Sequence, residues 1–190
     1  MELSKSNNFT KPKDIDYYRS LKIFNSDQAY QILLGLESKV DVNIYATVEF
    51  NSCQMEQIRR GLEANLDVTM YDNPLFSSEQ MRWILAGLEH NLDVAIYAKR
   101  VFNSEQMHEI WQGLEKGLDV SIYAKPEFNE DQMFQIREGL IQSIDVSSYL
   151  RTELSGKEML EIRKELLCAM GVTASVTGTR ADRWELGAPY

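Results

Sequence analysis

Apolar and polar positions along the chain repeat with a period of 26 residues. In the fourth copy, Met107, Ile110 and Leu114 recur at the three- and four-residue spacing of a helix. A shorter group, D-V-x-x-Y, follows each of the first five helical stretches. The pattern therefore predicts a long helix and a short helix in every full unit. The units align on Phe24, Phe50, Phe76, Phe102, Phe128 and, degenerately, Leu154.

The predicted long helix carries signals for both of its ends. In the fourth copy Asn103 suits an N-cap, and Gln106 three residues later completes a capping box. Phe102 before the cap and Met107 after it form a hydrophobic staple. Gly117 suits a left-handed residue just beyond the helix, which predicts a helix of about three turns. Asn65 and Asn91 hold the position of Gly117 in other copies.

The second half of each unit repeats this chemistry on a smaller scale. Asp119 suits an N-cap, and Leu118 and Tyr123 flank it as a second staple. The short helix is expected from Val120 to about Ala124. Because neither helix can bury its apolar stripe alone, neighbouring units must stack. The predicted fold class is all-α, an α-solenoid of two-helix repeats.

A glycine recurs in the interior of the predicted long helix, where it costs about 1 kcal/mol relative to alanine. The expected cause is close approach of the neighbouring helix. Glu165 holds this position in the last unit, so we expect that unit to be a terminal cap. The repeated glycines are Gly35, Gly61, Gly87, Gly113 and Gly139.

Four segments follow from this alignment. Residues 1–23 form an N-terminal segment with a half unit from Asp14 to Tyr18, and residues 24–153 form five full repeats. Residues 154–170 form a C-terminal capping helix, and residues 171–190 form a tail with Trp184, Leu186 and Tyr190. The tail is either disordered or folded back on the last helix.

The repeated motif F-N-S-x-Q-M-x-x-I-x-x-G-L-E-x-x-L-D-V-x-x-Y-A resembles a short tandem repeat of bacterial and phage proteins that are largely uncharacterised. The resemblance extends from Phe24 to about Met170. It implies an association with mobile elements and brings no catalytic residues. The chain departs from the motif at Ala29, Ile141 and Ser148 and through the last unit.

The charge composition bears on which class of macromolecule the protein can bind. A net charge of −9 and a pI near 4.8 argue against direct nucleic-acid binding, which requires clustered Lys and Arg. Basic proteins remain plausible partners. Cys53 and Cys168 form no disulfide framework, and we expect neither a signal peptide nor a membrane span. The sequence therefore favours a cytoplasmic protein.

No arrangement of residues predicts catalysis. His90 and His108 lie in different units, and neither has a metal-ligand partner one helical turn away. Phosphate-binding and nucleophile motifs are absent. A repeated aspartate suggests a metal site, but its position before the short helix is explained by capping. We expect no enzyme activity, no cofactor and no metal. These aspartates are Asp41, Asp67, Asp93, Asp119 and Asp145.

Two positions of the long helix vary between copies on a face that is expected to be polar, and Trp83 lies between these two positions in the third unit. They carry aromatic, aliphatic and arginine side chains, the types that dominate binding hot spots. The alternative is that the repeats bury these side chains against themselves, and both interpretations stay open. The expected partner-binding residues are Tyr30, Arg59, Arg82, Trp83, His108, Trp111, Phe134 and Arg137.

A second column of the predicted long helices is acidic. Stacked helices lie about 8–10 Å apart, so the carboxylates would form a ladder of like charge that a basic partner could relieve. Simple solubility is the other explanation. The expected acidic surface consists of Glu37, Glu63, Glu89 and Glu115.

These observations favour a non-enzymatic scaffold that binds a partner protein through the variable face of its long helices. The alternative is a phage or mobile-element inhibitor of a host nucleic-acid-handling enzyme, similar in strategy to an anti-CRISPR protein. Such an inhibitor would place its acidic surface in the basic channel of a nuclease or another nucleic-acid-binding protein. The sequence leaves the oligomeric state open.

Overall fold

The computed structural model describes residues 14–171. They divide between Val68 and Thr69 into two compact units, an N-terminal unit of described residues 14–68 and a C-terminal unit of described residues 69–171. Residues 1–13 and the predicted tail beyond Gly171 lie outside the described residues. The alternatives of a disordered or folded-back tail therefore concern residues that the structure does not describe.

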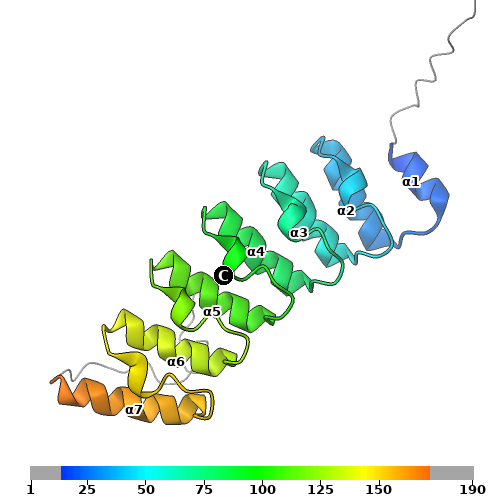
Figure 1. Ribbon diagram of the computed structural model, residues 1–190. Coiled ribbons are helices and arrows are strands. Elements are labelled where there is room, and N and C mark those ends of the chain that lie inside the picture. Colours follow the sequence, from blue (N-terminus) through cyan, green and yellow to red (C-terminus); the bar gives the residue numbers. More distant parts are fainter. Residues whose placement is uncertain (1–13, 172–190) are drawn as a thin grey trace, which may run out of the picture. The chain divides into compact units, whose positions relative to one another are not determined.

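Three α-helices follow one another in the N-terminal unit, where α1 packs on α2 and α2 packs on α3 (Figure 1). The short 3₁₀ helix η1 packs on α2. A second 3₁₀ helix, η2 (Val68–Met70), spans the division between the units. The helices of the N-terminal unit are α1 (Ile15–Leu21), α2 (Ser26–Glu37), η1 (Val42–Ile44) and α3 (Ser52–Glu63).

Four long helices stack in order in the C-terminal unit, each against the next, and a 3₁₀ helix packs on each of the first three (Figure 1). With no strand among residues 14–171, the fold is the all-helical repeat solenoid that the sequence predicts. The helices of this unit are α4 (Ser78–Glu89), η3 (Val94–Ile96), α5 (Ser104–Glu115), η4 (Val120–Ile122), α6 (Glu130–Ile141), η5 (Val146–Ser148) and α7 (Gly156–Ala169).

The long helices begin and end where their capping residues predict. Asn103 accepts the backbone N–H of Gln106, and the Gln106 side chain accepts the N–H of Asn103 in return. At the other end Gly117 has a φ of +67°, and the Leu118 N–H bonds the Gly113 carbonyl at 2.9 Å. This 6→1 bond is the signature of a Schellman cap. The same left-handed conformation occurs at Lys39, Asn65, Asn91, Ser143 and Gly171.

The second helix of each unit is shorter than predicted. It is a single 3₁₀ turn, as in η4 from Val120 to Ile122, instead of a helix reaching Ala124. The turn ends at Tyr123, which has a φ of −127°, accepts the Lys125 N–H at 2.7 Å and buries its ring completely. Conversely, the predicted N-terminal half unit forms a true α-helix, α1, capped by Asp14.

The repeated glycine has a different cause from the expected one. A Cβ on Gly113 would overlap the hydroxyl of Tyr123 and lie 2.7 Å from Val120 Cγ1. Both side chains belong to the 3₁₀ turn of the same repeat, not to the neighbouring long helix. The Tyr123 hydroxyl also donates to the Glu109 carbonyl at 3.1 Å. Gly35, Gly87 and Gly139 meet a tyrosine and a valine in the same way.

The glutamine that recurs in the capping box of the first five long helices also joins neighbouring repeats. Gln106 Nε2 donates to the Phe128 carbonyl at 2.6 Å, while its Oε1 caps its own helix. Gln28, Gln80 and Gln132 reach the next repeat in the same way. The last repeat has Glu158 at this position, which keeps the capping oxygen but offers no amide donor.

None of the helices described between residues 14 and 171 combines the length and apolar character that crossing a bilayer requires.

Gly113→Ala should destabilise the protein, although the same change in an exposed helix is stabilising. The added methyl group would compete with the Tyr123 hydroxyl, so we expect a loss of about 1–3 kcal/mol in the free energy of unfolding. Urea denaturation measures it. Adding Tyr123→Phe should recover part of the loss, and Glu165→Ala at the equivalent position of α7 should have little effect. A stabilised Gly113→Ala protein would contradict this account.

Gln106→Glu should destabilise the protein by about 1–3 kcal/mol at neutral pH, because a carboxylate would face the Phe128 carbonyl without a donor. Protonation restores a donor, so folding raises the pKa of the introduced carboxyl. Its stabilising contribution is then present at low pH and is lost as pH rises through that pKa. Denaturation between pH 4 and 7 should show the deficit growing with pH. Glu158→Gln, where no repeat follows in the described chain, is the matched control.

Candidate partner-binding surface

The candidate surface is the variable face, defined by three positions on each long helix. On α5 these positions are His108, Glu109 and Trp111, and on α6 they are Phe134, Gln135 and Arg137. Successive residues are about 100° apart around a helix. Measured from Gly113, which faces the 3₁₀ turn, the first and third positions of α5 lie about 140° and 160° away on the far side of the helix, and the second lies about 40° away.

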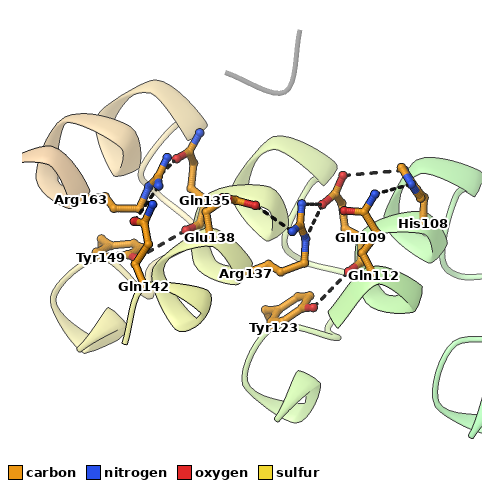
Figure 2. Close-up of polar contacts among 10 residues, drawn as sticks. All are labelled: His108, Glu109, Gln112, Tyr123, Gln135, Arg137, Glu138, Gln142, Tyr149 and Arg163. Atoms are coloured by element: carbon orange, nitrogen blue, oxygen red, sulfur yellow. Dashed lines mark hydrogen bonds and ion pairs between the residues drawn. The ribbon is translucent and has the colours of Figure 1, made fainter. Parts of the chain in front are cut away.

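Residues of the variable face pair across neighbouring helices with a separation of 28 positions. In the N-terminal unit Arg59 Nε donates to Gln31 Oε1 at 3.0 Å. In the C-terminal unit Arg163 Nε donates to Gln135 Oε1 at 3.1 Å, and Arg137 Nε donates to Glu109 Oε2 at 2.9 Å (Figure 2). The variation between copies therefore has a structural cause, because each arginine meets an acceptor one helix earlier.

The interface of α5, α6 and α7 contains a buried polar network. Arg137 is completely buried, and its guanidinium contacts Glu109 at 2.9 Å and Glu138 at 2.8 Å. The neighbouring Arg163 donates to Gln142 Oε1 at 2.9 Å, and burial lowers the pKa of its guanidinium. Figure 2 shows both arginines directed at acceptors on adjacent helices. Removing the Arg137 guanidinium would leave Glu109 and Glu138 without their buried cation.

One interface uses aromatic rings instead of polar pairs. Trp83 of α4 stacks on His108 of α5 with ring centroids 4.1 Å apart, and Trp111 lies 5.5 Å from Trp83. The Arg82 guanidinium lies 5.3 Å from the Trp83 ring centroid. His90 packs edge-on against Trp111. We call these five residues, Arg82, Trp83, His90, His108 and Trp111, the aromatic cluster.

The structure separates the expected partner-binding residues by burial. Tyr30 and Arg82 are exposed, and Arg59, Trp83 and Trp111 are half-buried. His108, Phe134 and Arg137 are buried, which is the alternative that the sequence left open for this face. Their side chains offer no contact surface to a partner in this state. Sequence reasoning missed Gln31, Glu109 and Gln135, although their separation of 28 residues from an arginine is visible in the sequence.

The four glutamates of the expected acidic surface are all exposed. Glu63 accepts from Arg59 and from Ser38 of the preceding repeat, each at 2.7 Å, and Glu115 lies 3.2 Å from His90 Nδ1. Partial burial raises the pKa of Glu63, but the bonds from Ser38 and Arg59 outweigh it and lower the pKa overall. The ionised Glu63 carboxylate therefore stabilises the fold at neutral pH, and this stabilisation is lost as pH falls through the lowered pKa.

The repeated aspartates and the buried tyrosines have structural roles. Asp41, Asp93, Asp119 and Asp145 each accept a backbone N–H from two residues ahead and so cap their 3₁₀ turns. Burial raises the pKa of Tyr149 to about 12, which keeps its hydroxyl protonated as a donor to the Gln135 carbonyl. Among residues 14–171 no group of three His, Cys, Asp or Glu side chains is arranged to hold a metal ion.

No family model matches the chain, and comparison with curated proteins and with solved structures found no match.

Arg137→Ala should cost about 3–5 kcal/mol of unfolding free energy, because it leaves Glu109 and Glu138 without their buried cation. Glu109→Gln should cost about 1 kcal/mol or less, because it recreates the Gln135–Arg163 pair of the next interface. Thermal and urea denaturation of both variants provide the comparison. Equal losses in the two variants would show that the pairing across helices does not govern stability here.

Proposed function

We propose that this chain is a non-enzymatic protein-binding scaffold whose contact surface includes the aromatic cluster on α4 and α5. The observation that carries the proposal is the exposed part of that cluster. Arg82 is exposed beside the half-buried rings of Trp83 and Trp111, and His90 is about half exposed. Trp and Arg are the residues that most often dominate binding energy at protein interfaces.

The cluster combines rigidity with available surface. The stack of Trp83 on His108 and the packing of His90 against Trp111 hold the rings in place before a partner arrives. A pre-organised side chain loses less conformational entropy on binding, so more of the contact energy appears as affinity. The guanidinium of Arg82 adds five hydrogen-bond donors at the rim.

The acidic surface supports the proposal less well than the aromatic cluster does. Glu63 already accepts hydrogen bonds from Arg59 and Ser38, and Glu115 already lies beside His90. A basic partner would have to compete with these contacts or extend them. The Arg82 guanidinium, by contrast, is exposed and contacts a ring of the aromatic cluster itself.

The test is capture of partners from host lysate by the tagged full-length chain, followed by affinity measurement with the purified candidate. Trp83→Gln supplies the residue that three other repeats carry at this position, Gln31, Gln57 and Gln135, so it is compatible with the fold. Together with Arg82→Ala it should weaken binding by about 2 kcal/mol or more. Raising the salt concentration should weaken the interaction only slightly.

Arg100→Ala, an exposed arginine in the turn before α5, is the matched control and should leave the affinity unchanged. Binding that survives Trp83→Gln and Arg82→Ala would refute the proposed surface. If that binding also falls steeply with salt and is lost with Glu37→Lys and Glu115→Lys, it belongs to the acidic surface. Circular dichroism of each variant separates loss of affinity from loss of fold.

A further inference from the structure

Arg82 is the arginine of the variable face whose guanidinium has no acceptor in the stack. Its side chain is exposed, and no hydrogen bond or ion pair joins it to another group among residues 14–171. The guanidinium therefore keeps its five N–H donors available to another molecule. The other arginines of the variable face donate to side chains of the stack, and these are Arg59, Arg137 and Arg163.

The ring of Trp83 supports this guanidinium. Arg82 Cζ lies 5.3 Å from the centroid of the Trp83 ring, which is the range of a cation–π contact. Trp83 in turn stacks on His108 with ring centroids 4.1 Å apart, and this stack fixes the plane of the ring. A guanidinium that rests on a fixed ring loses less conformational freedom when it binds a further group.

The charges around Arg82 limit what can bind there. Glu79 lies one helical turn earlier and is exposed, and Ser78 Oγ donates to its carboxylate at 3.1 Å. A hydrogen bond from its own backbone N–H lowers the pKa of Glu79 most, and the charge of Arg82 lowers it further. Glu89 and Glu115 are exposed at the ends of α4 and α5. A run of acidic residues or a phosphate backbone would therefore be repelled by these carboxylates, whereas a single carboxylate at Arg82 would be accepted.

We infer that Arg82 binds one Asp or Glu carboxylate of a partner protein, and that apolar residues beside this carboxylate cover Trp83. Two parallel N–H groups of a guanidinium match the two oxygens of a carboxylate. The apolar neighbours follow from the half-buried rings of Trp83 and Trp111, whose centroids lie 5.5 Å apart. The inference rests on the proposed protein-binding function and adds the chemistry of the segment that is bound.

A contact of this kind determines which segment binds more than how tightly it binds. Charged groups across an interface contribute chiefly to specificity, because the wrong charge opposite a fixed cation is strongly disfavoured. The expected signature is therefore a preference for an acidic residue at one position of the bound segment, next to apolar residues. A general attraction to acidic proteins is not expected, because the chain carries a net charge of −9.

Selection of short random peptides, displayed as a library, on the full-length chain tests the inference. Peptides that bind this chain but not its Trp83→Gln, Arg82→Ala variant should carry Asp or Glu next to aliphatic or aromatic residues. The same selection on Arg82→Glu should enrich Lys or Arg at that position, because the charge of the recognising group is reversed. Arg100→Glu makes the same charge change in the exposed turn before α5, so it is the matched control and should keep the acidic preference.

A synthetic peptide from the first selection then measures the contact directly. Arg82→Ala should weaken its binding at least about tenfold. Arg82→Lys should cause an intermediate loss, because lysine keeps the charge but not the paired N–H groups. Replacing the acidic residue of the peptide with its amide should weaken binding to the unaltered chain and have little further effect on Arg82→Ala.

The outcomes separate this inference from the proposed function. Peptides that require Trp83 but show no acidic preference, or keep that preference with Arg82→Glu, would overturn the inference and leave the proposed surface standing. If no selected peptide depends on Trp83 and Arg82, both fail. Because Arg82 is exposed and makes no bond within the described stack, its substitutions should leave the fold intact, which circular dichroism verifies.

Discussion

The seating of a tyrosine against a glycine within the same repeat is the contact on which the rest of the structure depends. It holds the 3₁₀ turn against the long helix, as Tyr123 does over Gly113, and buries the tyrosine ring completely. The hydroxyl then finds a carbonyl of the helix, so burial leaves no unsatisfied donor. With the turn held within each repeat, neighbouring repeats join through one recurring glutamine bond and through the packed faces of their long helices.

These contacts within and between repeats explain which positions of the long helix differ from one repeat to the next. The glycine, tyrosine, methionine and glutamine positions are occupied by internal packing and by the bond to the next repeat. On the long helices, variation is therefore found on the remaining side. There it takes two forms: pairs matched across neighbouring helices, such as Glu109 with Arg137, and outward residues that differ without a matched partner, such as Tyr30 and Arg82. The second kind offers exposed side-chain surface to another molecule.

Much of the fold was predictable because its signals are local. Asn103, Gln106 and Gly117 act through backbone groups no more than four residues away, so spacing alone identifies the helix ends. The candidate surface was less predictable. His108, Phe134 and Arg137 have the residue types of a binding hot spot, and composition does not distinguish them from Arg82. The pairing of Arg137 with Glu109 depends on which helix faces which, and that register is a property of the stack.

The sequence by itself determined the repeat, its period, its capping residues and the all-helical class, because these follow from short-range hydrogen bonding and helical periodicity. Tertiary structure alone decided why the glycine recurs, since the clash involves Tyr123 and Val120, which follow it by ten and seven residues. It also decided which variable side chains are buried. Burial is a property of what lies across a residue in space, and Tyr30 and Phe134 occupy the same repeat position with opposite exposures.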